Sequence, residues 1–306
     1  MRTHYDFYPN ERDSIVKRFG LAFFEKAIGD LDTYAERWEL SASRLIPSYS
    51  ANLVWTCESE RYGRCVLKIG NPASKEMAAE YNALREYDGK GMCSVFAADL
   101  ANSVLLQERV QPGTPLRDEP SLEARLSVFS SIQQGLHIPP ANASLYPTYA
   151  DWVARITAYM SKREDCAALY IYMNKANDIC RSLASTYTRV MLLHGDLHHD
   201  NMLRRQDGSY AIIDPKGVIG DPIFDIPRFI LNEFEEELNE QLYRKINRVI
   251  DTLGQSLDIP QTVIRQCLFI ETAMGNCWMV EDGATPEACR QLLANVAFAD
   301  AILQDI

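Results

Sequence analysis

The sequence predicts an α+β fold with two lobes, a small N-terminal lobe rich in β-hairpins and a larger, mostly helical C-terminal lobe. Short valine-, leucine- and aromatic-rich runs separated by polar turns occupy residues 53–110. After residue 121, long stretches carry apolar residues at helical spacing instead. A cluster of structure breakers, QPGTP at residues 111–115, separates the two patterns. We therefore expect lobes of residues 1–110 and 111–306 that share an active-site cleft.

In the N-terminal lobe, residues 11–40 carry apolar side chains at helical spacing and predict a helical extension. NLVWTC and GRCVLKI, separated by the turn ESERY, predict a β-hairpin. The stretch NPASKEMAAEYNALREYDGKG predicts a helix that ends at its glycines. SVLLQERV predicts a further strand, and the breaker cluster follows it.

In the C-terminal lobe, helices are predicted in SLEARLSVFSSIQQGLHI, YADWVARITAYM and KANDICRSLASTYTRV. VMLL predicts a short strand. MLRRQ and YAIID flank the pair Asp207-Gly208, which is a strong hairpin signal because both residue types tolerate positive φ. Helices are expected again from Pro227 to the end.

The composition is that of an ordinary globular protein, with 47% hydrophobic and 24% charged residues. A net charge of −11 disfavours nucleic acid as a partner and favours cationic ones. No apolar run approaches the ~18 residues of a membrane span, and the start MRTHYDFYPNERD lacks an apolar signal core. The eight cysteines form no CxxC pair. We expect a cytoplasmic protein with reduced cysteines and no membrane partner.

The segment HGDLHHDNMLRRQDGSYAIIDPKG, which begins at His194, has the residues that phosphoryl transfer from ATP requires. That reaction needs a carboxylate for the acceptor hydroxyl, oxygen ligands for Mg²⁺ and a lysine for the phosphates. Asp196 precedes Asn201 at the spacing H-x-D-x-x-x-x-N, and Asp214 stands beyond the hairpin. A hairpin returns the chain to its start, so Asn201 and Asp214 are expected to converge on one metal ion.

This segment and its continuation GVIGDPIFDI resemble the aminoglycoside phosphotransferase family, whose fold is protein-kinase-like. The ending IDPKG…GDPIFD is similar to the branch of streptomycin 6-kinases and hydroxyurea phosphotransferases. The resemblance extends through AERWEL, CVLKIG, EYNALREYDGKG, LLQERVQPGTPL and NCWMVEDG. It implies an ATP- and Mg²⁺-dependent kinase of a small hydroxylated compound, with streptomycin-like aminocyclitols as the leading acceptors.

The resemblance also implies a role for individual residues. Asp196 is the expected catalytic base, and Asn201 and Asp214 are the expected magnesium ligands. Asp225 is the expected buried anchor of the catalytic loop. The implied nucleotide-binding residues are Lys68, Glu80 as the partner of Lys68 (with Glu76 as the alternative), and backbone groups of the adenine hinge from Glu108 to Val110.

Two departures from the family pattern concern the phosphates. The hairpin expected to cover them has no glycine before its turn, so Ser48, Ser50 and Asn52 would have to supply donors. Lys216 stands two residues beyond Asp214, where many kinases have an apolar residue or glycine. Lys216 either stabilises charge on the transferred group as part of the catalytic machinery or forms a salt bridge with a nearby aspartate.

The acceptor is expected on the helical lobe and is expected to be cationic. A guanidinium-bearing aminoglycoside pairs well with carboxylates. The candidate contacts are Asp200, which is otherwise a solvated or capping residue, and Trp278, Glu281 and Asp282 in WMVEDG. The acidic run NEFEEELNE at residues 232–240 is a further candidate, with a solvated helix face as the alternative.

Three other functions compete with this prediction. One is a kinase of hydroxyurea or of another metabolite, because acceptor choice depends on few contacts. Another is a nucleotide-binding pseudokinase, which the intact set of Lys68, Asp196, Asn201 and Asp214 disfavours. The third is a zinc hydrolase that uses His194, His198 and His199, whose spacing lacks the usual geometry of zinc ligands.

Overall fold

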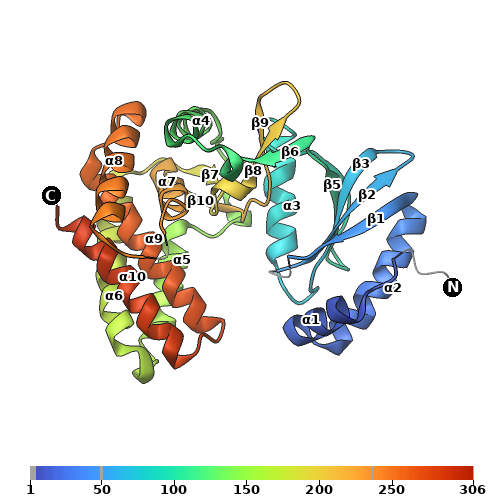
Figure 1. Cartoon of the computed structure of the whole chain (residues 1–306), viewed down its shortest axis with the longest axis horizontal. Helices are drawn as coiled ribbons and strands as arrows, with labels where there is room; N and C mark the ends of the chain where they lie inside the picture. Colours follow the sequence, from blue (N-terminus) through green and yellow to red (C-terminus); the bar gives the residue numbers. More distant parts are fainter. Residues whose placement is uncertain (1–4, 49–50, 236, 306) are drawn as a thin grey trace. The chain divides into compact units, whose positions relative to one another are not determined.

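The structure is a computed structural model that describes residues 5–48, 51–235 and 237–305. Contacts divide the chain into two compact units. The first unit holds Met1–Thr114 and Leu203–Ile213, and the second holds Pro115–Met202 and Asp214–Ile306 (Figure 1). The prediction of a β-rich first part and a helical second part is confirmed.

Among the described residues, the first unit is built on a five-stranded antiparallel sheet with strand order β1-β2-β3-β5-β4. The strands are β1 (Leu40–Ile46), β2 (Leu53–Ser59), β3 (Gly63–Ile69), β4 (Val95–Asp99) and β5 (Val104–Glu108). The hairpin β2–β3 and strand β5 confirm the prediction, whereas β1 and β4 were not predicted. These two strands are the edges of the sheet.

The two faces of this sheet differ because successive side chains of a strand point in opposite directions. Trp55, Leu67 and Leu106 are cross-strand partners and are fully buried against helices α1 (Pro9–Phe19) and α2 (Leu21–Arg37). Lys68 lies on the opposite face, toward helix α3 (Glu76–Tyr87). The helical extension expected over residues 11–40 is present as two helices, because Gly20, at φ +88°, ends α1 and begins α2.

A second, small sheet has the strand order β6-β8-β9. Its strands are β6 (Pro112–Pro115), β8 (Met202–Arg205) and β9 (Tyr210–Ile212). The predicted hairpin at Asp207-Gly208 is confirmed: Gly208 has φ +86°, and the Asp207 carboxylate accepts the N–H of Ser209 at 2.9 Å. Because Asp207 keeps a negative φ, glycine alone provides the left-handed residue of this turn.

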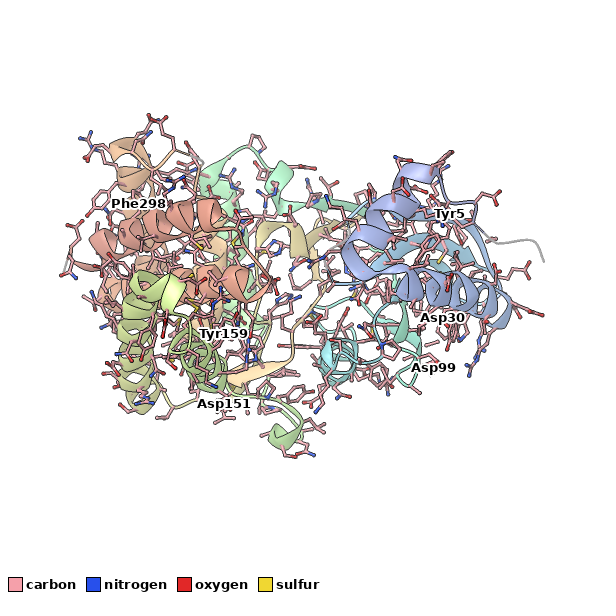
Figure 2. All side chains as sticks on the ribbon, turned by 90° about the horizontal axis from the view of Figure 1, so that it is seen from below. Tyr5, Asp30, Asp99, Asp151, Tyr159 and Phe298 are labelled. Atoms are coloured by element: carbon pink, nitrogen blue, oxygen red, sulfur yellow. The ribbon has the colours of Figure 1, made fainter. Side chains whose placement is uncertain are left out.

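Helices dominate the second unit (Figure 1). They are α4 (Leu122–Gly135), α5 (Tyr149–Met160), α6 (Ala167–Thr186), α7 (Ile226–Leu231), α8 (Glu240–Leu257), α9 (Gln261–Glu281) and α10 (Pro286–Leu303). Strands β7 (Met191–Leu193) and β10 (Val218–Gly220) pair in antiparallel fashion. Thr148 and Asp151, the latter labelled in Figure 2, form a capping box that fixes the start of α5.

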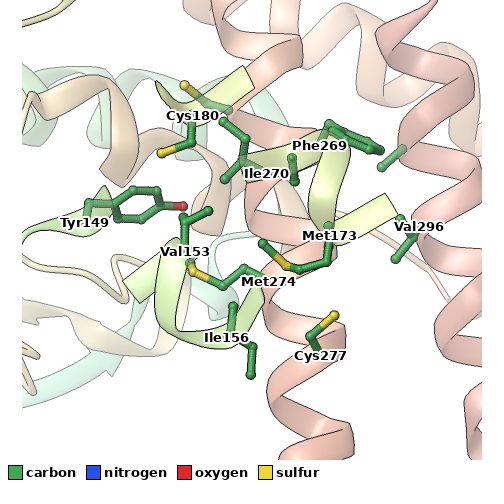
Figure 3. Packing of buried hydrophobic residues seen from close by; sticks show 14 of the residues in the cluster. Tyr149, Val153, Ile156, Met173, Cys180, Phe269, Ile270, Met274, Cys277 and Val296 are labelled. Carbon is green, nitrogen blue, oxygen red and sulfur yellow. The ribbon is translucent and has the colours of Figure 1, made fainter. Parts of the chain in front are cut away.

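Helices α5, α6, α9 and α10 enclose a hydrophobic cluster of this unit. Figure 3 shows Val153 and Ile156 of α5, Met173 of α6 and Met274 of α9 meeting in its interior. Packing of this kind is close to crystalline in density, so α5 and α9 are held rigidly. These two helices carry several of the side chains described next.

Candidate active site

The predicted catalytic loop leaves β7 and is anchored by a buried aspartate. Asp225 accepts the backbone N–H groups of His194 and Gly195, each at 2.7 Å, and contacts His137 Nε2 at 2.8 Å. Burial raises the pKa of Asp225, but the His137 bond and the nearby positive groups outweigh burial and hold this pKa below its usual range. The expected anchoring role of Asp225 is confirmed by these bonds.

Asp196, the predicted base, lies within this loop beside three cationic or titratable side chains. Arg228 contacts Asp196 Oδ1 through two nitrogens: Nη2 lies at 2.5 Å, and Nε donates a hydrogen bond at 2.7 Å. Asp196 Oδ2 lies 3.9 Å from Lys216 Nζ and 3.8 Å from His198 Nε2. Burial raises the pKa of Asp196, but Arg228, His198 and Lys216 together lower it below its usual range. Asp196 is therefore an ionised carboxylate at neutral pH.

Asn201 and Asp214, the predicted magnesium ligands, lie on either side of the β8–β9 hairpin. Asn201 is the last residue of a single 3-10 turn, directly before β8, and Asp214 follows β9 by two residues. The Asn201 amide nitrogen donates to the Asp196 backbone carbonyl at 2.9 Å, which leaves the amide oxygen as the atom that can face a cation. One amide and one carboxylate oxygen fit Mg²⁺, which prefers few protein oxygens together with phosphate ligands.

Gly195 and Lys216 are packed together at the same loop. Gly195 has φ +77°, and a Cβ there would lie 2.9 Å from Trp152 Cη2 and 3.2 Å from Lys216 Cβ. The Lys216 N–H donates to the His194 carbonyl at 2.7 Å, which fixes the backbone of Lys216 against the loop. Its side chain is 43% exposed. Both predicted roles of Lys216 are compatible with its distance from Asp196.

In the first unit, the predicted ion pair of Lys68 and Glu80 is confirmed. Lys68 Nζ lies 2.6 Å from Glu80 Oε1, and both side chains are buried, with exposed fractions of 4% and 9%. Glu76, the alternative partner, is exposed at the start of α3. A buried, paired lysine is held in one place, as a phosphate-binding group must be.

The other predicted nucleotide-binding residues lie in the first unit as well. The Glu108 N–H donates to the Ser94 carbonyl at 2.8 Å, and the Glu108 carboxylate binds Arg205. The Val110 carbonyl accepts a hydrogen bond from the side-chain amide of Gln111 at 3.1 Å. Asn52 fills the space beside Gly70, where a Cβ would lie 2.5 Å from Asn52 Oδ1. Ser50 lies outside the described residues.

Asp200 and the acidic run both have partners within the protein. Arg117 binds Asp200 with two bonds of 2.6 and 2.7 Å. Helix α7 ends at Leu231 and α8 begins at Glu240, so the described residues of the acidic run before Glu240 do not form a helix face. Its Glu233 is buried and accepts two bonds from Arg125, at 2.7 and 2.8 Å. Although burial raises the pKa of Glu233, bonds with His199 and Arg125 lower it to about 2. We therefore assign Glu233 a structural role.

The candidate acceptor residues lie at the end of α9 and are connected to the catalytic loop through α5. Trp278 meets Trp152 edge to face, with ring centroids 5.7 Å apart. Arg155 binds Glu281 with two bonds of 2.6 and 2.9 Å. Asp282 caps the C-terminus of α9 and is exposed. Since Trp152 also touches Gly195, the two tryptophans form a continuous surface that leads to the residue before Asp196.

The three histidines of the loop have separate partners. His194 Nδ1 accepts the Asp196 N–H at 3.1 Å, His198 Nδ1 accepts the Asp200 N–H at 3.3 Å, and His199 Nε2 lies 2.9 Å from Glu233. Within the part of the chain that the structure describes, no three or more His, Cys, Asp and Glu side chains are grouped to hold a metal ion. The three rings therefore brace the loop.

Four residues near Asp196 were not predicted: Trp152, Tyr149, Arg228 and Glu271. Arg228 and Glu271 each stand within an apolar run, IPRFIL and LFIETAM. A charge in such a run is costly unless it is paired, so both residues could have been identified from the sequence. For Trp152 and Tyr149, the sequence of α5 shows an ordinary amphipathic helix and carries no comparable signal.

Comparison with known proteins identifies the family of the chain. A family model described as "Aminoglycoside/hydroxyurea antibiotic resistance kinase" matches residues 37–283. Streptomycin 6-kinase of Streptomyces griseus is 26% identical over 86% of this chain and 86% of its own length. Hydroxyurea phosphotransferase of Kitasatospora aureofaciens is 26% identical over 96% and 85%, respectively.

Solved structures share the fold. Choline kinase LicA from Streptococcus pneumoniae has a TM-score of 0.68 at 14% identity, and 91% of this chain and 99% of that chain are covered. An aminoglycoside phosphotransferase APH(4)-Ia in complex with ADP and hygromycin B has a TM-score of 0.58 at 16% identity, with 89% and 97% covered. The predicted protein-kinase-like fold is thereby confirmed.

None of the helices within the described residues is long and apolar enough to span a membrane. The match of the family model covers well over half of the sequence, and the named relatives are a kinase and a phosphotransferase. The chain is a phosphotransferase and belongs to the aminoglycoside/hydroxyurea antibiotic resistance kinase family.

Proposed function

We propose that the chain is an ATP- and Mg²⁺-dependent kinase that phosphorylates a hydroxyl group of a streptomycin-like aminoglycoside. The observation that carries this proposal is the ionised Asp196, held in an anchored loop with Asn201 bonded to its backbone. Curated relatives named as streptomycin 6-kinases and as a streptomycin 3''-kinase support the acceptor class.

In this proposal, Asp196 orients the acceptor hydroxyl and accepts its proton as the new bond to phosphorus forms. Lys68, placed by Glu80, contacts the phosphates of ATP, and backbone groups from Glu108 to Val110 contact the adenine. Asn201 and Asp214 hold Mg²⁺, which when bound neutralises phosphate charge. Because little covalent chemistry falls to the protein, positioning and electrostatics supply most of the rate.

Lys216 has a defined place in this scheme. It lies 3.9 Å from Oδ2 of Asp196, on the side of the carboxylate that Arg228 does not occupy. A cation beside the base can stabilise the charge that accumulates on the transferred phosphoryl group. Replacing Lys216 with methionine is then expected to lower kcat, and an unaltered kcat would assign Lys216 to a structural role.

For the acceptor, we propose the surface formed by Trp152 and Trp278 together with Glu281, Asp282 and Asp200. A cyclitol ring can lie on an indole face, and a guanidinium group can interact with indoles or carboxylates. Glu281 and Asp200 are already bound to Arg155 and Arg117, respectively. A cationic acceptor must therefore exchange with these arginines or share the carboxylates with them.

Hydroxyurea is a second candidate acceptor, because one relative is named a hydroxyurea phosphotransferase. A screen with Mg-ATP should include streptomycin, other aminoglycosides, hydroxyurea, choline and common sugars, with product detection by mass spectrometry. We expect streptomycin to give a phosphorylated product at the highest kcat/KM. Nucleotide binding without turnover of any acceptor would instead favour a pseudokinase.

A further inference from the structure

The two oxygens of the Asp196 carboxylate have different surroundings. Arg228, on α7, directs both Nε and Nη2 at Oδ1, at 2.7 and 2.5 Å. Among the described residues, the neighbours recorded for Oδ2 are more distant: Lys216 Nζ at 3.9 Å and His198 Nε2 at 3.8 Å. A guanidinium often binds a carboxylate through both oxygens. Here it binds through one, so the other keeps the better access to a substrate.

Arg228 is in turn held by a buried pair. Glu271 Oε1 lies 3.8 Å from Arg228 Nε, and Glu271 Oε2 accepts the hydroxyl of Tyr149 at 2.5 Å. The Glu271 side chain is 2% exposed. Figure 3 shows the Tyr149 hydroxyl directed into the helical cluster that includes Ile270, the neighbour of Glu271. Side chains from α5, α9 and α7 thus form a chain of contacts that ends at Asp196.

We propose that Arg228, held by Glu271 and Tyr149, is a positioning residue that fixes Asp196 through Oδ1 and presents Oδ2 to the acceptor hydroxyl. This inference rests on the proposed function, in which Asp196 is the base. During transfer, the bond between the acceptor oxygen and the γ-phosphorus forms as the bond to ADP breaks. The proton of the hydroxyl passes to Oδ2.

Asp196 needs such positioning because an aspartate carboxylate rotates easily about its χ2 torsion. The χ2 torsion of aspartate has a broad minimum, so an unrestrained Asp196 would present either oxygen over a range of angles. In-line transfer tolerates errors of only about 0.5 Å in the position of a catalytic group. Two bonds to one oxygen remove this freedom, and the remote Glu271–Tyr149 pair removes the freedom of Arg228 itself.

The test replaces Arg228 with methionine and with lysine and separates kcat from KM. We expect Arg228→Met to lower kcat on the order of 100-fold while KM for ATP and for the acceptor changes little, since misplacement of a reacting group acts on the chemical step. Arg228→Lys should recover part of kcat, because one donor replaces two. In Arg228→Ala, added methylguanidinium should raise kcat more than methylammonium does at the same concentration, because the guanidinium supplies two donors and the ammonium replaces them with one.

A double variant and a matched arginine control distinguish a loss of positioning from a loss of stability. Arg228→Met leaves Glu271 without its cation, so Arg228→Met combined with Glu271→Gln should fold better and keep the low kcat. Arg265, a buried arginine of α9 that donates to the Ile302 carbonyl at 3.2 Å, provides a matched control. Arg265→Met should lower thermal stability without changing kcat of the folded protein.

The possible outcomes separate the two proposals. A wild-type kcat in both Arg228→Met and the double variant, with Asp196→Asn inactive, would overturn the positioning role and leave the proposed function intact. Loss of kcat in Arg228→Met without rescue by lysine or methylguanidinium would also overturn it. Full activity of Asp196→Asn would overturn the assignment of Asp196 as the base, on which the positioning role depends, and absence of turnover with every acceptor of the screen would overturn the proposed function.

Discussion

At the scale of single residues, burial decides which charged side chains are held in place. Lys68 and Glu80 are both buried in the first unit, and in the second unit the buried Glu271 lies 3.8 Å from Arg228, which is partly exposed. Each charge is expensive to bury alone and acceptable only with its partner. The same residues are the ones to which we assign phosphate contact or positioning, because a paired and buried charge has little freedom to move.

The Lys68–Glu80 pair should separate stability from activity. Glu80→Gln removes the carboxylate that lies 2.6 Å from the buried Lys68 and is expected to cost about 3–5 kcal/mol of unfolding free energy. Lys68→Met combined with Glu80→Leu should restore most of that stability, because two apolar side chains replace two charges. Chemical denaturation measures the free energy, and steady-state kinetics measures KM for ATP.

The double variant should nevertheless have a much higher KM for ATP or a lower kcat. Glu76→Gln, on the same helix but exposed, is the matched control and should change neither property by a measurable amount. A stable double variant with wild-type ATP kinetics would contradict the assignment of Lys68 to the phosphates.

At the scale of elements, the sequence indicated the parts with a strong periodic pattern. Strands β2, β3 and β5 are central and largely buried, so their apolar runs were visible. The edge strands β1 and β4 were not recognised from the sequence. Strand β1 is mostly exposed or half-buried and has an irregular register between Ser41 and Arg44, and β4 is half-buried throughout. Their positions depend on pairing with neighbours, which local sequence does not encode.

Part of the candidate site was predictable from the sequence, namely the residues that are close together along the chain. The order and spacing of Asp196, Asn201 and Asp214 are local in sequence, and the hairpin between them was recognised from Asp207-Gly208. Arg228 and Glu271 come from two other helices and meet the loop only through tertiary packing. Sequence spacing alone therefore indicated the loop, and the structure was needed for the residues that hold it.

Two glycines of positive φ, Gly195 and Gly208, test whether kcat depends on the backbone conformation of the catalytic loop. Gly195→Ala would place a Cβ 2.9 Å from both Trp152 and Val218, whereas Gly208→Ala meets nothing within 4 Å. Both changes carry a backbone cost of roughly 1–2 kcal/mol. We expect only Gly195→Ala to lower kcat strongly, because the clash displaces the residue next to Asp196. Equal effects of the two variants on kcat, measured at saturating substrate, would contradict this account.

At the scale of the whole molecule, stability should depend on pH through Glu271. Burial raises the pKa of Glu271 to about 7, although Arg228 and Tyr149 act in the opposite direction and Asp196 and Asp225 add to the rise. The folded protein therefore binds this proton more tightly than the unfolded chain, whose carboxyl has its ordinary pKa near 4.5. Stability from this group is complete below pH ~4.5 and is lost as the pH rises toward 7.

The measurement is the difference in unfolding free energy between the wild type and Glu271→Gln across this range. The glutamine has no titrating proton, and all other groups contribute equally to both proteins. The wild type should lose about 3 kcal/mol relative to the variant between pH 4.5 and pH 7, from ~1.4 kcal/mol per pKa unit, and the difference should then level off. A difference that does not change with pH would show that Glu271 titrates normally.

The central claim, that Asp196 accepts the proton of the acceptor hydroxyl, is tested most directly by Asp196→Asn. The amide has nearly the same shape but cannot take up the proton, so binding and folding should persist. We predict that calorimetry finds wild-type affinity for Mg-ATP and that kcat with the best acceptor falls on the order of 100- to 10,000-fold. An Asp196→Asn protein that phosphorylates this acceptor at the wild-type rate would contradict the account.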